Sequence, residues 1–166
     1  MTVQSSRGRS TSTEQHVARL LRSFRRWTGR DLLTGDGSPR ELAKYLFHAP
    51  FVVISHGTEG DPIFNYANRA ALELWEMPWD EFTRTPSRLT AEPADRTTRA
   101  ALLTQVTAKG FIDGYRGVRV SKTGRRFLIE RAIVWNVLDE RDDHCGQAAT
   151  FDSWSHLGPG PVDSPS

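Results

Sequence analysis

Three strand-like segments follow one another in the C-terminal half of the chain, and they constrain the fold more than any other feature. The first is Tyr115–Ser121, and the second is the long run Arg126–Leu138, which is rich in Phe, Ile, Val and Trp. Such residues are enriched in strands. The turn Lys122–Gly124 joins these two segments, and the charged stretch Asp139–His144 separates the second from Gln147–Asp152. Short polar connections of this kind predict three consecutive antiparallel strands.

A second group of strands is predicted earlier in the chain. Phe51–His56 is a short apolar, β-branched run, and the turn-forming segment Gly57–Pro62 leads into Ile63–Tyr66. This order is typical of a β-hairpin. The chain therefore has five predicted strands in two groups.

Helices are predicted between the two groups of strands. Asn68 is placed to cap a helix over Arg69–Glu76, and Pro78–Phe82 indicates one further helical turn. The Pro- and Thr-rich segment Thr83–Pro93 gives no clear prediction, whereas Ala94–Lys109 returns to helical spacing. This order predicts an α+β fold, with a mainly antiparallel five-stranded sheet and helices on one face.

An N-terminal flanking helix is predicted ahead of the sheet. The capping box Thr11–Glu14 opens it, and its apolar residues fall on one face: Val17, Leu20, Leu21, Phe24 and Trp27. A second capping box, Ser38–Glu41, opens a short helix that must end before Pro50.

These features divide the chain into four parts. We expect a disordered tail over residues 1–12, the flanking helix over 13–30, one domain over 38–155 and a second disordered tail over 156–166. Both tails lack the apolar residues needed to offset the entropy lost on ordering.

The basic charge is concentrated at the N-terminus. Lys and Arg total 22 against 20 Asp and Glu, yet residues 1–30 contain seven arginines and one acidic residue, Glu14. The rest of the chain therefore has more acidic than basic residues. Lys and Arg supply most of the nonspecific affinity for nucleic acid, so binding of nucleic acid by the domain is not expected.

The cysteine content and the hydropathy predict a cytoplasmic protein. Cys145 is the single cysteine, which leaves no intrachain disulfide and no Cys-x-x-Cys site. The N-terminal residues lack the apolar run of a secretory signal, and no segment approaches the roughly 18 apolar residues of a membrane span.

Three sequence blocks resemble a known family. The strand, Asn cap and helix around Asn68, followed by Pro78–Phe82, resemble the corresponding part of PAS domains. More specifically, His56–Trp75, Gly117–Gly124 and Gly146–Phe151 resemble the MEKHLA domain family, whose fold is PAS-like, and the likeness extends over about Leu20 to Trp154. The size of the chain resembles the stand-alone bacterial members.

The resemblance implies a sensory or regulatory module that binds a small ligand or a protein partner. The family also includes a C-terminal domain of plant homeodomain leucine-zipper transcription factors. This chain has no homeodomain and no zipper heptads, so their DNA-binding role does not transfer. In PAS-like proteins the helix ahead of the core frequently forms a dimer contact, which makes a homodimer through the N-terminal helix a candidate assembly.

A PAS-like sheet covered by helices encloses a pocket, and such ligand sites are concave and mostly apolar. We expect five residues to line it: Tyr66, Trp75, Trp79, Trp135 and Gln147. Each tryptophan can instead be interpreted as a residue that packs in the core and does not line a pocket. Gln147 is placed by the resemblance, because its position on the last strand contacts flavin in light-sensing PAS domains.

The sequence assigns no cofactor and no metal. The Asn-Cys-Arg-Phe motif of flavin-reactive domains is absent, so cysteine-based flavin photochemistry is not expected. His48 and His56 are interpreted as structural or exposed histidines and not as haem ligands. Adjacent residues such as His144 and Cys145 do not generally converge on one ion, so a solvated turn is predicted there.

No catalytic function is predicted, because no nucleophile elbow and no phosphate-binding loop are present. The first alternative is a small pocket enzyme of the ketosteroid-isomerase-like group, which would need an inward-facing carboxylate from Glu130 or Asp152. The second is a protein-binding adaptor with a filled core.

Overall fold

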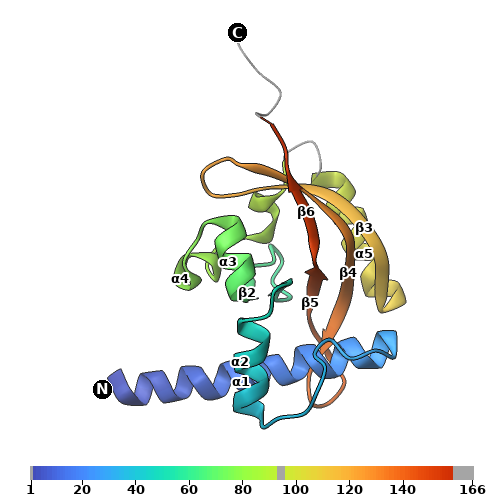
Figure 1. Cartoon of the computed structure of the whole chain (residues 1–166). Coiled ribbons are helices and arrows are strands. Elements are labelled where there is room, and N and C mark those ends of the chain that lie inside the picture. Colours follow the sequence, from blue (N-terminus) through green and yellow to red (C-terminus); the bar gives the residue numbers. More distant parts are fainter. Residues whose placement is uncertain (1, 93–95, 159–166) are drawn as a thin grey trace.

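The computed structural model describes the backbone of residues 2–92 and 96–158, and the side chains from Ser12 onward within these ranges. Its centre is an antiparallel sheet in the order β2-β1-β5-β4-β3, with β6 also paired to β4 (Figure 1). The strands are β1 (Val52–His56), β2 (Phe64–Ala67), β3 (Phe111–Val120), β4 (Arg126–Leu138), β5 (His144–Phe151) and β6 (Ser153–His156). The predicted α+β class is confirmed.

The strands β5 and β6 together pair with β4 along most of its length. β5 lies beside Ile133–Leu138, and β6 lies beside Phe127–Glu130. Between the two halves Arg131 has a positive φ of 56°, and its side chain donates a hydrogen bond to Ser153 Oγ at 2.7 Å. The sixth strand was not predicted, because four residues with two serines carry no clear strand pattern.

Two strands begin earlier than predicted. β3 begins at Phe111 instead of Tyr115, and β5 begins at His144 instead of Gln147. In β3 the residues Asp113 and Gly114 conceal the pattern, because both types are depleted in strands. The pairing with β4 shifts register on both sides of Tyr115, which accommodates them.

The helical elements are α1 (Thr2–Thr28), α2 (Pro39–Phe47), α3 (Arg69–Trp75), α4 (Trp79–Phe82), the 3-10 helix η1 (Ser87–Thr90) and α5 (Arg96–Lys109). None of the described helices has the length and apolarity needed to cross a membrane. α1 begins ahead of the predicted cap at Thr11, so residues 2–12 are helical where a tail was predicted. A formed helix extends at low cost where no proline interrupts it. The predicted start of α5, Ala94, lies outside the described residues.

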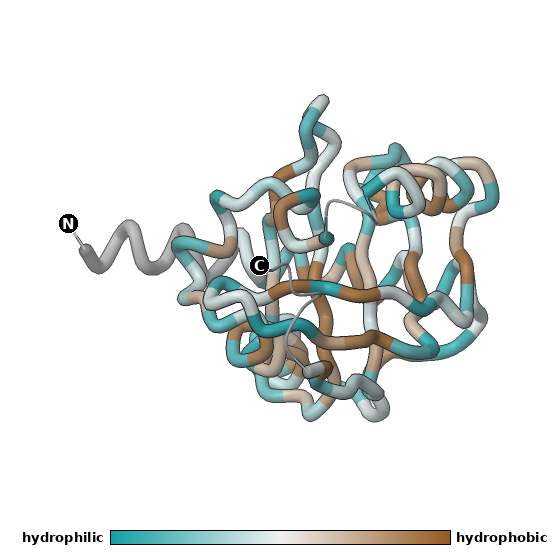
Figure 2. Tube along the Cα trace, turned by 90° about the horizontal axis from the view of Figure 1, so that it is seen from above, coloured by the Kyte–Doolittle hydropathy of each residue, from teal (hydrophilic) through white to brown (hydrophobic). Residues whose placement is uncertain are grey.

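Helices cover both faces of the sheet and not one face as predicted, because the strands bury apolar side chains on both faces. On one face Val52, Phe127 and Phe151 form a core with α3 and α4, and Val134 packs against α5. On the other face Val53, Trp135 and Val137 pack against α1 and α2, which contribute Val17, Leu20, Phe24 and Leu46. Figure 2 shows hydrophobic stretches of strands and helices facing one another inside the molecule.

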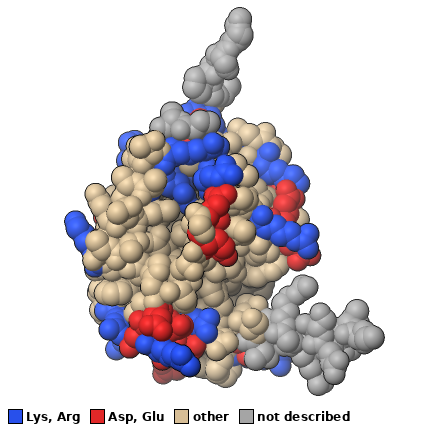
Figure 3. Space-filling view, turned by 180° about the vertical axis from the view of Figure 1, so that it is seen from behind, with Lys and Arg blue, Asp and Glu red and all other residues tan. Residues whose placement is uncertain are grey.

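The arginines of α1 pair with the body of the protein. Arg19 donates two hydrogen bonds to Glu140, at 2.8 and 2.7 Å, and Arg26 lies 3.0 Å from Asp142. Figure 3 shows basic and acidic side chains close together on the rear face of the molecule. Exposed pairs of this kind contribute little to stability individually. They do show that acidic side chains of the body partly neutralise this basic helix.

Asn68 joins three elements of the fold with one buried side chain. Its Oδ1 accepts hydrogen bonds from Val53 N at 3.1 Å and from Ala71 N at 3.2 Å, so the predicted cap of α3 is present. Its Nδ2 donates to Leu46 O at 3.1 Å and Phe51 O at 2.8 Å. The carboxamide therefore forms hydrogen bonds with backbone groups of α2, β1 and α3 and fixes the positions of these elements relative to one another.

We predict that Asn68→Ala lowers the free energy of unfolding by about 3 kcal/mol, because four backbone groups lose a hydrogen bond to this buried side chain. Ser38→Ala is the matched control, since Ser38 caps α2 at an exposed site. The control should cost only about 1 kcal/mol. Urea unfolding followed by circular dichroism measures both, and equal losses would contradict the role assigned to Asn68.

Candidate functional site

A partly open cavity of about 60 Å³ lies between the sheet and α5. Its walls are mostly apolar, with side chains from β1, β2, β4, β5 and α5: Ile54, Phe64, Leu102, Leu103, Ile129, Ala132, Val134, Ala148, Ala149 and Phe151. The polar lining residues are Ser55, His56, Thr90, Arg99, Tyr115, Arg119 and Gln147. Mostly apolar walls with a few polar groups are the usual composition of a ligand site.

Arg119 reaches this cavity from β3 and is only 8% exposed. Its Nη2 donates to the hydroxyl of Tyr115 at 3.0 Å, and its Nη1 donates to Val118 O at 3.0 Å. The guanidinium also lies over the Tyr115 ring, 5.5 Å from its centroid. A Cβ at Gly117 would overlap the Tyr115 hydroxyl, so glycine there leaves room for this arrangement.

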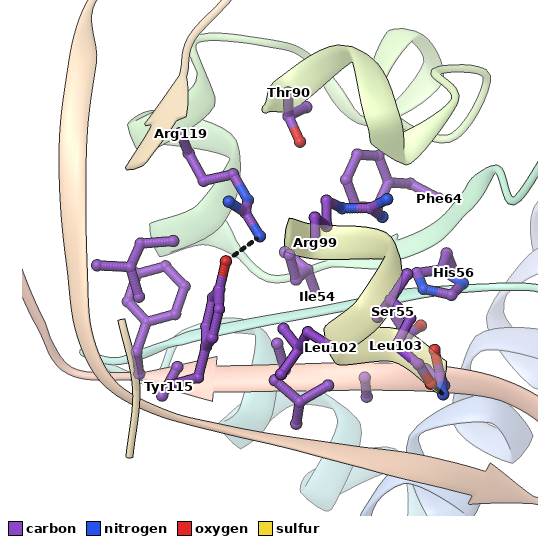
Figure 4. Close-up of a pocket in the computed structure, with 17 residues that line it drawn as sticks. Ile54, Ser55, His56, Phe64, Thr90, Arg99, Leu102, Leu103, Tyr115 and Arg119 are labelled. Carbon is purple, nitrogen blue, oxygen red and sulfur yellow. Dashed lines mark hydrogen bonds between the residues drawn. The ribbon is translucent and has the colours of Figure 1, made fainter. Parts of the chain in front are cut away.

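Arg99 reaches the same cavity from α5. It donates a hydrogen bond to Ser87 Oγ, which connects α5 to η1. Burial and, to a smaller extent, the positive charge of Arg119 lower the pKa of Arg99 to about 10. The guanidinium of Arg99 therefore remains charged at neutral pH. Figure 4 shows the two arginines at one end of the cavity, with Leu102 beyond them.

His56 presents a buried acceptor without a partner. Its Nδ1 lies 2.9 Å from Gly57 O, and because a carbonyl only accepts, Nδ1 carries the proton. Nε2 is then an acceptor, and it has no hydrogen-bond partner among the described residues. Burial lowers the pKa of His56, which keeps the ring neutral.

Gln147 connects the cavity wall to α1 through Asn136. Its Nε2 donates to Asn136 Oδ1 at 3.1 Å, and Trp27 Nε1 of α1 donates to Asn136 O at 2.8 Å. Asn136 Nδ2 also donates to Val106 O of α5 at 3.0 Å. The Trp27 ring lies against Gly110, where a Cβ would overlap it. This network joins β5, β4, α5 and the end of α1.

A second connection to α1 runs through His16. Its Nε2 lies 2.8 Å from Ser55 Oγ, and Ser55 donates its only hydroxyl proton to Asn65 Oδ1. His16 Nε2 must therefore carry a proton and donate it to Ser55. Burial lowers the pKa of His16 to about 4, with a further contribution from Arg19. Both ends of the docked part of α1 thus contact residues that line the cavity or adjoin it.

The structure brings one of the five predicted pocket residues, Gln147, into the cavity wall. Trp75 is fully buried in the core beside Phe82, Phe127 and Phe151. The other three, Tyr66, Trp79 and Trp135, belong to the core beneath α1 and α2. Tyr66 and Trp135 lie on the opposite face of the sheet from the cavity. Tyr66 and Trp79 instead border a surface groove beside His16.

Sequence reasoning missed Arg99, Tyr115 and Arg119. The alternation in Gly117–Val120 suggests that the valines face inward, but Arg119 is buried and shares the cavity-lining face of β3 with Tyr115. Arg99 follows a segment without a clear pattern, and nothing local indicates that its helix face is covered. Arg119 stands between two valines in a predicted strand, and this placement is the one sequence signal that could have identified the site.

The pocket-enzyme alternative loses its candidate carboxylates. Glu130 pairs with Arg116 at 3.7 Å and its side chain is 46% exposed, while Asp152 is exposed. Neither lines the cavity, and no other Asp or Glu of residues 12–92 and 96–158 does. Among the described residues no group of three or more His, Cys, Asp and Glu could hold a metal ion.

Flavin and haem do not fit the cavity. Pockets for ligands of drug size have volumes of roughly 300–1,000 Å³, several times the volume found here. His48 is exposed at the end of α2, and His56 Nδ1 is engaged with Gly57 O.

Solved structures share this fold. The PAS domain of a Colwellia psychrerythraea protein matches with a TM-score of 0.59 and 15% identity, over 71% of this chain and 95% of that one. A light-oxygen-voltage domain studied with a flavin analogue matches with a TM-score of 0.55 and 15% identity, over 71% and 85%. An RNA-binding light-oxygen-voltage receptor gives 0.56 and 14%, over 72% and 36%. The chain therefore has a PAS-like fold.

The family is defined by sequence. Residues 14–156 match the model of the MEKHLA domain, so this chain belongs to the MEKHLA domain family, as the sequence blocks predicted.

The curated relatives are plant proteins. Homeobox-leucine zipper proteins ATHB-15 and ATHB-8 of Arabidopsis thaliana are 28% and 30% identical, over 89% and 88% of this chain. HOX32 of Oryza sativa is 29% identical over 88%. The chain spans less than a fifth of their length, at 18%, 18% and 17%. The stand-alone bacterial type is not confirmed by these relatives and stays a prediction.

The lowered pKa of His16 makes the free energy of unfolding depend on pH. In the unfolded chain a histidine takes up its proton near pH 6.5, whereas His16 in the folded protein resists protonation down to about pH 4. The contribution of neutral His16 to the free energy of unfolding is therefore complete above pH 6.5. It is lost as the pH falls toward 4, by up to ~1.4 kcal/mol per pH unit.

We expect His16→Gln to reduce the slope of unfolding free energy against pH between 6.5 and 4. Part of the slope should remain, because burial also lowers the pKa of His56 and His144. Above pH 7 the difference between the two proteins should be constant, which serves as the internal control. Urea unfolding at a series of pH values gives both curves, and parallel curves below pH 6.5 would refute the assignment.

Proposed function

We propose that this chain is a regulatory module that binds a small ligand in the cavity under α5 and passes the occupancy of that cavity to α1. The hydrogen-bonded connection from Gln147 through Asn136 to Trp27 carries the proposal, because it joins the cavity wall to a helix on the other side of the sheet. The contact between His16 and Ser55 supports it at a second point on α1.

The size of the cavity limits the ligand. A cavity needs about 10–15 Å³ to hold one water. A cavity of 60 Å³ therefore holds a few waters or a ligand with about six non-hydrogen atoms. A ligand can shift the equilibrium between two docked states of α1 only by the difference in its affinity for these two states. The proposed signal is therefore a change in how α1 is docked.

The role proposed here is that of one domain. The names of the relatives describe homeobox-leucine zipper proteins, of which the matched region is a small part. A cytoplasmic location and a homodimer through α1 stay predictions. Val17, Leu20 and Phe24 are buried against the chain's own sheet, so a dimer contact would use another face of the docked helix.

A cavity-filling variant tests ligand binding. Ala149 lines the cavity and pairs with Val134, so Ala149→Leu places three additional carbon atoms there. We expect fragments of four to eight non-hydrogen atoms that bind the unmodified protein to bind this variant at least tenfold more weakly. Ala100→Leu, on the exposed face of α5, is the matched control and should bind normally. Ligand-observed NMR with a fragment panel measures these affinities.

Hydrogen exchange of α1 tests the transmission step. A bound fragment should change amide exchange in α1 of the unmodified protein and of Ala100→Leu, and should leave Ala149→Leu unchanged. Native mass spectrometry of freshly purified protein reports any ligand retained from the cell. If no fragment binds, or if fragments bind Ala149→Leu equally well, the cavity is not a ligand site.

A further inference from the structure

We propose that the ligand of this cavity is a short-chain carboxylate, with its carboxylate group held by Arg99 and Arg119 and its hydrocarbon chain against the apolar wall. This inference rests on the proposed function and names its ligand class. Three features support it: the charges at one end of the cavity, the apolar walls and the volume.

The two arginines carry positive charge, buried for Arg119 and partly buried for Arg99, that no Asp or Glu among the described residues neutralises through an ion pair. Among the described residues neither guanidinium forms an ion pair with Asp or Glu, although ten other basic side chains do. The groups that they contact are neutral: Tyr115 and Val118 for Arg119, and Ser87 for Arg99. Buried charges are normally paired. A bound anion would provide the missing negative charge.

The physical cost of this arrangement is visible at Arg99. Burial and the neighbouring Arg119 both disfavour its charged form. Guanidinium groups bind carboxylates through paired hydrogen bonds of well-defined geometry, which suits two arginines at one end of a cavity. An anion placed between them would reduce the repulsion and form charge-assisted hydrogen bonds.

The opposite part of the cavity selects against inorganic anions. Leu102, Leu103, Val134 and Ala149 offer no hydrogen bonds to the remaining oxygens of phosphate or sulfate. A hydrocarbon chain buries apolar surface there. The volume limits that chain to a few carbon atoms, and the free Nε2 of His56 can accept a hydrogen bond from a polar substituent.

Butyrate and butyramide test the charge directly, since they have the same shape and differ in charge. We expect the unmodified protein to bind butyrate at least tenfold more tightly than butyramide, and more tightly than inorganic phosphate at equal ionic strength. Isothermal titration calorimetry or chemical-shift titration measures the three affinities. Ala149→Leu should lose butyrate binding, which places the ligand in the cavity.

Arginine variants test the residues. Arg99→Met and Arg119→Met should each abolish the preference for butyrate over butyramide, and Arg99→Lys should retain part of it. Arg96→Met is the matched control, because it removes the same charge from α5 at a residue that does not line the cavity. This control should keep the full preference. Circular dichroism and urea unfolding establish that each variant is folded, and Arg119→Lys replaces Arg119→Met if the latter is not.

The outcomes separate this inference from the proposed function. If butyrate and butyramide bind equally, or if phosphate binds as tightly as butyrate, the carboxylate assignment is wrong while the cavity remains a ligand site. The same holds if other fragments bind and neither probe does. If no fragment of any class binds, both proposals fail. A preference for butyrate that survives in Arg99→Met and Arg119→Met would also overturn the inference.

Discussion

The structure depends on a sheet whose strands are apolar on both faces. Neighbouring residues of β1, Val52 and Val53, belong to different cores, and β4 likewise sends Val134 and Trp135 to opposite sides. Such a sheet must be covered twice. α3, α4 and α5 cover one face, and this requirement makes α1 a structural part of the domain and not an appendage. The cavity lies under α5, where part of the covering contact is replaced by open space and two arginines.

Local chemistry made the fold predictable. The capping side chains of Ser38 and Asn68 and the β-branched run of β4 act over a few residues, so their signals can be found in the sequence. β6 was missed, because its pairing with β4 depends on a partner far away in sequence. The resemblance to the MEKHLA family provided the topology that these local signals leave open.

The site was less predictable, because the direction of a strand side chain depends on register. Tyr66 and Trp135 were sensible candidates by type, yet each stands on the face that α1 covers. Both side chains pack among the apolar residues of the core beneath α1 and α2, which identifies them as packing groups. Arg119 faces the cavity because it stands on the same face of β3 as Tyr115, which also lines the cavity. Large aromatic residues indicate a packed core, whereas a buried charge without an ion pair indicates the charge of the ligand that the cavity would bind.

Energetics limit what a signal from this cavity can do to α1. Val17, Leu20 and Phe24 are buried, and each contributes about 1.5–3 kcal/mol to keeping the helix in place. The connection through Trp27 and Asn136 is one hydrogen bond, whose net contribution is about 1 kcal/mol. A ligand that weakens this bond therefore alters an equilibrium by roughly fivefold and leaves the apolar contacts intact. The end of α1 near Trp27 is then the part that responds, because it combines this bond with a close contact at Gly110, while the rest of the helix stays docked.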